Sequence, residues 1–119
     1  MISVFVYGTL RSGQSARHRI EPYILECNPG SVTGYLYNAG AWPGLVIDPQ
    51  GEEIAGEWLL LKEEALPIMD EWEDYYGPED SRNDYERIWT RDSRQSYEGW
   101  VYIWKNDRDF PRILSNSWV

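Results

Sequence analysis

The segment from residue 97 to residue 104 constrains the fold more than any other part of the chain. Its pattern predicts a strand, in which every second side chain points to the same face. Both faces are largely apolar or aromatic: one carries Tyr97, Gly99, Val101 and Ile103, and the other carries Glu98, Trp100, Tyr102 and Trp104. Such a strand is covered on both sides, which indicates a small barrel with a filled interior and further elements packed outside it.

Strands dominate the rest of the expected secondary structure as well. Five more are predicted over residues 4–7, 31–37, 44–47, 54–61 and 85–91. The polar residues 92–96 predict a hairpin between the last two strands, and residues 14–26 around Pro22 predict a turn or a short broken helix. No repeat or linker divides the chain, and its 119 residues suit a single domain over residues 1–119.

The best helical pattern covers residues 63–76 and places one acid on the border of its apolar face. On a helical wheel, the other acids lie more than about 100° from the centre of that face, whereas Glu73 lies only about 65–70° away. Partial burial raises the pKa of a carboxyl group toward the range of a general base. Two readings stay open at this point: Glu73 belongs to a site, or it merely borders the apolar face or pairs with an arginine.

A turn at residues 7–13, with the sequence YGTLRSG, follows the first predicted strand. Such a turn can direct consecutive backbone N–H groups at one point and bind a carboxylate or phosphate. Gly8 would let a ligand approach the backbone closely. The spacing and the lysine of a Walker loop are absent. The same residues also fit a plain turn that ends a strand.

Composition excludes several classes of function. Aromatic residues make up 15% of the chain, which predicts a folded protein. The formal net charge of −9 offers no basic surface to nucleic acid or to an anionic membrane, and no apolar run is long enough to span a bilayer. With Cys27 and His18 as the only cysteine and histidine, we expect no metal, no haem and no Cys–His catalysis.

The start of the chain shows no secretory signal, so a cytoplasmic protein is the default expectation. Cys27 is expected to be a small buried residue, and His18, between two arginines, a surface residue.

Three short motifs occur in a distinctive order. The YGTL turn is Tyr7-Gly8-Thr9-Leu10, and a helix close to the pattern LDxxE follows as Met69-Asp70-Glu71-Trp72-Glu73. A Tyr-x-Arg pattern, Tyr85-Glu86-Arg87, then opens the next strand. Over residues 4–118 the chain thereby resembles the gamma-glutamylcyclotransferase-like family. Members of that family often end in Gly-Asp-Trp, where this chain has Asn116-Ser117-Trp118.

The resemblance implies an α+β fold: a small mixed β-barrel with a few short helices and a cavity at one end. It also implies an enzyme that needs no cofactor and releases 5-oxoproline from a gamma-glutamyl amine or gamma-glutamyl amino acid. The substrate's own α-amine attacks its γ-carbonyl, so the enzyme mainly has to hold the attack geometry. A small gamma-glutamyl compound is thus the expected partner, and the chain is expected to be a monomer or a weak homodimer.

Site residues follow from the matching motifs. Glu73 becomes the general acid/base, and the substrate-binding residues are Tyr7, Gly8, Thr9, Leu10, Tyr85 and Arg87. The N–H groups of Gly8, Thr9 and Leu10 would hold either the substrate's α-carboxylate or the developing oxyanion. Arg87 either pairs with an acid near the site or braces the fold.

Two alternatives remain open from the sequence. One is a non-catalytic protein that binds a small ligand on the same fold. The other is a carbohydrate-binding β module, in which several exposed tryptophans would stack on sugar rings. The barrel interpretation instead expects Trp58, Trp100 and Trp104 to be mainly shielded from water.

Overall fold

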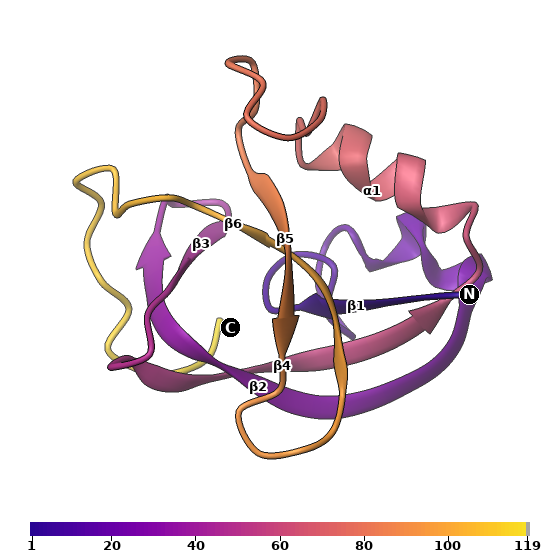
Figure 1. The fold of residues 1–119 in the computed structure, drawn as a ribbon, viewed down its shortest axis with the longest axis horizontal. Helices are drawn as coiled ribbons and strands as arrows, with labels where there is room; N and C mark the ends of the chain where they lie inside the picture. The colour runs from indigo at the N-terminus through magenta and orange to yellow at the C-terminus, as the bar shows by residue number, and fades with distance from the viewer. Residues whose placement is uncertain (119) are drawn as a thin grey trace.

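The computed structural model describes residues 1–118, which contain six strands, one α-helix and two single-turn 3-10 helices (Figure 1). The strands are β1 (Ile2–Val6), β2 (Ile24–Asn38), β3 (Pro43–Ile47), β4 (Glu52–Leu61), β5 (Glu86–Arg91) and β6 (Glu98–Ile103). The helices are η1 (Arg17–Arg19), η2 (Glu21–Tyr23) and α1 (Ala65–Trp72). None of these helices is long and apolar enough to cross a membrane.

The strands form one mixed sheet in the order β3-β2-β4-β1-β6-β5. β1 pairs in parallel with β6, and all other neighbouring strands are antiparallel. The sheet curls so strongly that β3 meets the end of β6, where the Trp104 N–H donates to the Leu45 carbonyl at 2.9 Å. The result is a curled half-barrel, which confirms the predicted α+β fold (Figure 1).

β2 is much longer than predicted. It begins at Ile24 instead of residue 31 and pairs with β4 over most of its length. Pro29 is unusual inside a strand, because proline cannot donate a backbone hydrogen bond. However, β3 pairs only with residues 34–38 of β2, so the segment around Pro29 is a free edge where proline is tolerated. Cys27 lies on this edge and is exposed, so the prediction that it is buried was wrong.

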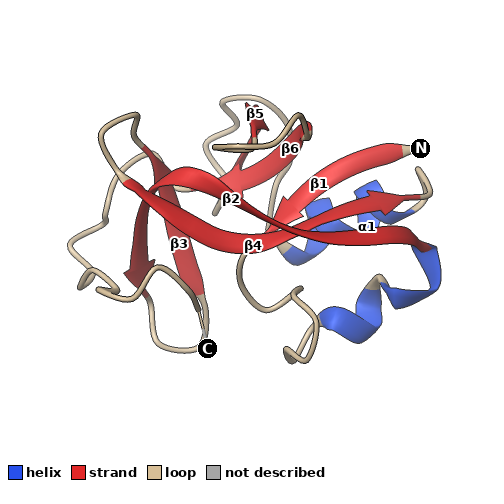
Figure 2. Cartoon of the chain, turned by 90° about the horizontal axis from the view of Figure 1, so that it is seen from below, coloured by secondary structure: helices blue, strands red, loops and turns tan. Residues whose placement is uncertain are grey.

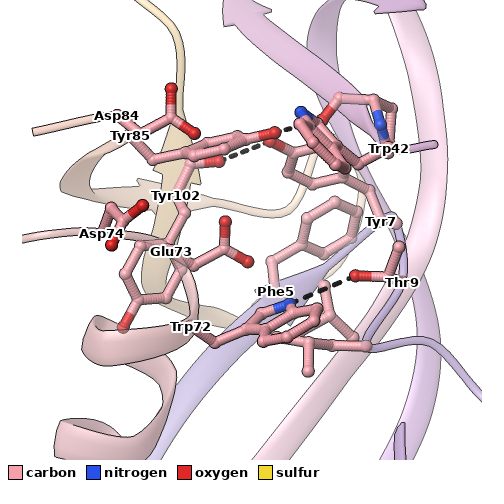
Figure 3. A pocket seen from close by; sticks show the side chains of 14 residues that line it. Phe5, Tyr7, Thr9, Trp42, Trp72, Glu73, Asp74, Asp84, Tyr85 and Tyr102 are labelled. Carbon is pink, nitrogen blue, oxygen red and sulfur yellow. Dashed lines mark hydrogen bonds between the residues drawn. The ribbon is translucent and has the colours of Figure 1, made fainter. Parts of the chain in front are cut away.

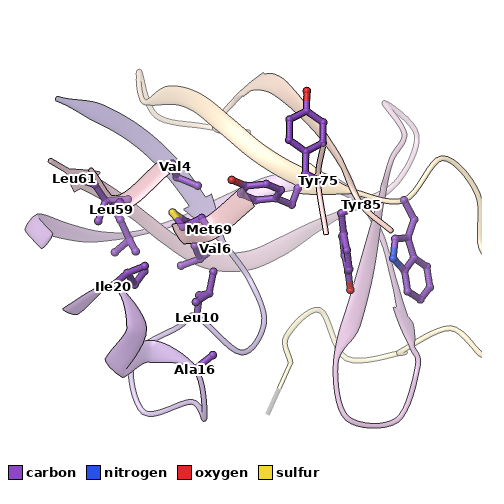
Figure 4. Packing of buried hydrophobic residues seen from close by; sticks show 13 residues of the cluster. Val4, Val6, Leu10, Ala16, Ile20, Leu59, Leu61, Met69, Tyr75 and Tyr85 are labelled. Carbon is purple, nitrogen blue, oxygen red and sulfur yellow. The ribbon is translucent and has the colours of Figure 1, made fainter. Parts of the chain in front are cut away.

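Buried side chains form two clusters on the two faces of the sheet. One lies under the helices and includes Val4 and Val6 of β1 together with Met69 of α1 (Figure 4). The other lies inside the curl and includes Phe5 and Trp58. Figure 2 shows the helices gathered on one side of the sheet. Burial of a side chain such as Met69 contributes about 2 kcal/mol, so this packing holds the short α1 in place.

β6 and Trp104, the residue that follows it, contribute to both clusters, as the two apolar faces of residues 97–104 predicted. Val101 and Ile103 belong to the cluster inside the curl, whereas Tyr102 and Trp104 belong to the cluster under the helices. Trp58 and Trp104 are only 2% and 1% exposed. Trp100 is half-buried and packs edge-on against Trp89 at 5.1 Å. Trp58 and Trp104 thus fill the half-barrel, and Trp100 is partly shielded, as the barrel interpretation expects.

Candidate active site

A cavity of about 200 Å³ opens at one end of the half-barrel (Figure 3). It brings together six of the seven residues that the motifs predicted for the site: Tyr7, Gly8, Thr9, Leu10, Glu73 and Tyr85. They come from three separate parts of the chain: the turn after β1, the end of α1 and the segment that enters β5. The curl of the sheet is what makes these parts adjacent.

The C-terminal end of α1 determines the position of the Glu73 side chain. The Tyr75 N–H donates to the Asp70 carbonyl at 2.9 Å, and the Asp74 N–H donates to the Glu71 carbonyl at 3.2 Å. These two bonds form a Schellman motif, with Asp74 in the left-handed conformation at φ +51°. The helix therefore stops at Trp72 instead of residue 76, which corrects the predicted end. Glu73 becomes the capping residue, and its side chain points into the cavity (Figure 3).

The Glu73 carboxyl has an unusual environment. It accepts no hydrogen bond and forms no ion pair with any group of residues 1–118. Burial disfavours its charged form, and the nearby charges of Asp84 and Asp74 add to that effect, so that the pKa of Glu73 rises to about 8. The α1 C-terminus, the negative end of the helix dipole, faces the same side chain. This carboxyl group can therefore take up and release a proton near neutral pH.

The turn after β1 carries three backbone N–H groups without an acceptor among residues 1–118. The Gly8 and Thr9 carbonyls accept bonds from the Arg11 and Ala16 N–H groups at 3.0 and 2.9 Å. In a trans peptide the C=O and the N–H point in opposite directions, so the Thr9 and Leu10 N–H groups face away from these bonds. Within residues 1–118, the N–H groups of Gly8, Thr9 and Leu10 donate to no protein group. Such free N–H groups are suited to bind an anion.

Two tyrosines wall the cavity, but their hydroxyl groups are already occupied. The Tyr7 hydroxyl donates to the Tyr102 carbonyl at 2.6 Å and accepts from the Leu45 N–H at 3.2 Å. The Tyr85 hydroxyl donates to the Pro43 carbonyl at 2.6 Å. Burial raises the pKa of both hydroxyl groups above the usual range, so both stay protonated. Tyr7 and Tyr85 thus shape an apolar wall and are not acid/base groups.

Gly8 is required by the close approach of Pro43. A Cβ atom on Gly8 would lie 2.9 Å from two atoms of the Pro43 ring, closer than carbon atoms pack in proteins. Pro43 in turn lines the cavity and accepts the Tyr85 hydrogen bond. Gly8 therefore lets the turn and the start of β3 meet at the cavity.

Arg87 does not line the cavity, unlike the six other predicted residues. Its guanidinium bonds both Asp70 carboxylate oxygens at 2.7 Å and lies over the rings of Tyr75 and Trp100. The Tyr102 hydroxyl donates to the same carboxylate at 2.5 Å. The sequence left two roles open for Arg87, and these contacts fit both: Arg87 pairs with Asp70, an acid of α1 near the site, and the pair fastens α1 to the sheet beside the cavity.

The sequence did not indicate several other residues that line the cavity. Trp42, Trp72, Asp74, Asp84 and Tyr102 all do so. Trp42 lies in the loop before β3, and Asp84 immediately precedes the Tyr-x-Arg pattern. The Trp72 indole donates to the Thr9 hydroxyl at 3.3 Å and joins α1 to the turn (Figure 3).

The cavity itself is acidic. Glu73, Asp74 and Asp84 line it, and within residues 1–118 no lysine or arginine does. Asp84 is bonded by Arg108 at 2.7 Å, so part of its charge is balanced. No group of three or more His, Cys, Asp and Glu residues with the geometry to hold a metal ion occurs among the described residues. An acidic, partly apolar cavity next to free N–H donors suits a small molecule with both an ammonium and a carboxylate group.

A model of the family described as "Gamma-glutamyl cyclotransferase, AIG2-like" matches residues 4–119. The chain belongs to this family. A gamma-glutamyl cyclotransferase of Niallia circulans, named for gamma-L-glutamyl-butirosin B, is 36% identical over 121 residues, which cover 99% of this chain and 76% of that protein. The chain is therefore an enzyme of the gamma-glutamyl cyclotransferase type.

Solved structures show the same gamma-glutamyl cyclotransferase fold. An AIG2-like protein from Mus musculus matches with a TM-score of 0.76 at 24% identity, over 98% of this chain and 87% of that one. YkqA from Bacillus subtilis matches with a TM-score of 0.74 at 22% identity, over 98% of this chain but only 39% of that one. At these identities the likeness establishes the fold alone.

Proposed function

We propose that this gamma-glutamyl cyclotransferase releases 5-oxoproline from a gamma-glutamyl amine or amino acid, with Glu73 as the general acid/base. The observation that carries the proposal is the Glu73 carboxyl in the cavity, which has no hydrogen-bond or ion-pair partner among residues 1–118 and whose pKa is raised to about 8. A carboxyl group that is paired or fully solvated would be too weak a base for this task. The family match supports the substrate class, because a relative is named for a gamma-glutamyl compound.

The reaction needs two proton movements at the substrate's amine. Ionised Glu73 takes one proton from the α-ammonium group, and the freed amine attacks the γ-carbonyl carbon to close a five-membered ring. Glu73 then gives this proton to the leaving nitrogen as the bond between that nitrogen and the γ-carbon breaks. The ring nitrogen sheds a second proton through Glu73 to the departing amine or to water. Because the attack is intramolecular, positioning supplies much of the rate enhancement.

The free N–H groups of the turn are proposed to bind the substrate's α-carboxylate. Because no lysine or arginine among residues 1–118 lines the cavity, the carboxylate has no cationic side chain to pair with. The N–H groups of Gly8, Thr9 and Leu10, which donate to no group of the described residues, lie at the wall that the turn forms. The α-ammonium would then lie toward the acids on the opposite wall, where Glu73 can reach it.

The proposal is tested by measuring 5-oxoproline released from a panel of gamma-glutamyl amines and amino acids by the wild-type chain, Glu73→Gln and Glu71→Gln. Glu71 is a matched control, because it is an exposed acid two residues away on the same helix. We expect release by the wild type and by Glu71→Gln, and a loss of at least about 100-fold in kcat for Glu73→Gln. Release by Glu73→Gln at the wild-type rate would contradict the role of Glu73, and no release from any substrate would contradict the reaction.

A further inference from the structure

A partly buried ion pair lies directly behind the anion-binding turn. Glu57 of β4 and Arg17 of η1 are joined at 2.8 Å, and their side chains are only 16% and 13% exposed. Glu57 is opposite Val6, the last residue of β1, so its side chain is next to the start of the turn. Neither residue lines the cavity. An ion pair so well shielded from water is held more firmly than one on an open surface.

The ion pair forms hydrogen bonds with backbone groups of the turn. One Glu57 oxygen accepts from the Ser12 N–H at 2.7 Å as well as from Arg17. The same Arg17 nitrogen also donates to the Leu10 carbonyl at 3.3 Å. On its other side, Arg17 bonds Glu21 at 2.8 Å, which fixes the guanidinium. Thus two peptide groups of the turn are fixed by one ion pair.

These contacts also orient the Thr9 N–H group, because each peptide group of the turn is rigid. The Leu10 carbonyl and the Arg11 N–H share one rigid peptide group, so holding the carbonyl with Arg17 also orients that N–H. The Arg11 N–H donates to the Gly8 carbonyl, which belongs to the same peptide group as the Thr9 N–H. The orientation of the Thr9 donor therefore depends, through two peptide groups, on Arg17 and Glu57.

The ion pair also balances the negative charge of Glu57 behind the turn. A lone carboxylate behind the turn would repel an anion bound in front of it, whereas the Arg17 guanidinium neutralises Glu57 at 2.8 Å. Arg11 adds a separate anchor on the other side, where it donates to the Ser117 hydroxyl at 3.0 Å and the Trp118 carbonyl at 3.2 Å. Those two residues replace the Asp and keep the Trp of the family's usual ending.

We infer that Glu57 and Arg17 are positioning residues for substrate binding: their ion pair orients the N–H groups of the turn toward the substrate's α-carboxylate. The inference rests on the proposed function, in which those N–H groups bind that carboxylate. In this role the two residues neither contact the substrate nor take part in proton transfer.

The test compares two ligands that differ only in the carboxylate. 5-Oxoproline carries it, and 2-pyrrolidinone has the same ring without it. Their affinities are measured by titration calorimetry or NMR for the wild type, Glu57→Gln, Glu57→Ala and Arg17→Met, well below the melting temperature of each. Glu53→Gln is the matched control, because Glu53 lies on the same strand and pairs with Arg94 at 2.7 Å, away from the cavity.

We expect the wild type and Glu53→Gln to prefer 5-oxoproline. The preference should fall about tenfold in Glu57→Ala, less in Glu57→Gln, which keeps an acceptor for the Ser12 N–H, and most in Arg17→Met, which leaves the Glu57 charge unbalanced. The affinity for 2-pyrrolidinone should not change, whereas general loosening of the fold would weaken both ligands. With a gamma-glutamyl substrate, KM should rise and kcat change little.

An unchanged preference in Glu57→Ala and Arg17→Met, or equal affinities of the wild type for both ligands, would overturn the inference. These binding measurements need no turnover. A wild type that prefers 5-oxoproline but releases none from the substrate panel would therefore contradict the proposed reaction and leave the role of the ion pair intact.

Discussion

Glu73 shows how a single position decides the chemistry of the cavity. The chain has 20 acidic residues, and most of those on or near α1 are solvated or paired. Only for Glu73 do burial and neighbouring negative charge together raise the pKa to about 8. The helical wheel singled out this residue because it lay on the border of the apolar face. The wheel could not show that the helix ends just before it.

The raised pKa predicts the pH dependence of the reaction. If Glu73 must be ionised to accept a proton, kcat/KM should fall about tenfold for each pH unit below a limit near pH 8. A pH–rate profile of the wild type measures this limit directly. An acidic limit near 4.5, the ordinary value for glutamate, would show that the group is not desolvated as the structure indicates.

The same pKa predicts how Glu73→Gln changes stability. In the unfolded chain Glu73 ionises above its ordinary pKa of 4.5, whereas in the folded chain it stays protonated until about pH 8. The wild type therefore loses stability from this group as the pH rises from 4.5 to 8, and the cost is constant above that range. Glutamine does not titrate, so the two chains should melt alike near pH 4, and the variant should melt several degrees higher at pH 8.5.

Thermal melts of both chains between pH 4 and pH 9 provide the measurement. Other titrating groups are common to the two chains, so they cancel in the difference. A difference in melting temperature that does not grow with pH would contradict the raised pKa.

At the scale of elements, α1 and β2 show what the sequence could and could not predict. The strand pattern found all six strands, because alternation depends on residues close together in the chain. The start of β2 was missed, because residues 24–30 include a proline and a glycine, which are uncommon inside strands, and only the short β3 explains why that edge tolerates them. The end of α1 was missed because an aspartate, and not the usual glycine, adopts the left-handed conformation.

The site residues also divide into those that the sequence could predict and those that it could not. Six of the seven residues that the three motifs predicted do line the cavity, because each motif is a continuous segment with a recognisable order. Trp42 and Tyr102 line it only because the sheet curls. The bonds between Asp70 and Arg87 depend on how α1 sits against the sheet, which no local pattern reveals.

The helix end yields a prediction for Asp74. At φ +51° glycine is favoured over other residues, so Asp74→Gly should leave the free energy of unfolding unchanged or raise it by up to about 1 kcal/mol. Asp74→Ala should lower it by about 1 kcal/mol, because alanine is strained there. Urea unfolding of the two variants and the wild type measures these differences. Greater stability of the alanine variant than of the glycine variant would contradict the Schellman geometry.

Removal of the Asp74 charge should act on Glu73 as well. Asp74→Asn keeps a residue that tolerates the left-handed conformation but removes one of the two charges that raise the pKa of Glu73. The acidic limit of its pH–rate profile should therefore lie below that of the wild type. A limit that stays in place or moves up would contradict the electrostatic coupling between the two carboxyl groups.

At the scale of the whole molecule, the curl of the sheet joins sequence-distant parts into one unit. β1 is an inner strand, since it pairs with β4 on one side and with β6 on the other. Hydrogen exchange followed by mass spectrometry should therefore find its amides among the slowest, with exchange only on global unfolding. The edge strand β5 should exchange faster. Faster exchange in β1 than in β5 would contradict the strand order.

The central place of β1 also bears on how the chain is made. Because β1 precedes its parallel partner β6 by about a hundred residues, it waits unpaired on that side until β6 has been synthesised. The substrate-binding turn that follows β1 thus cannot take its final shape until much later in translation than the turn itself is made. Contacts between such distant segments slow folding, so this small enzyme should fold in one late step rather than piece by piece.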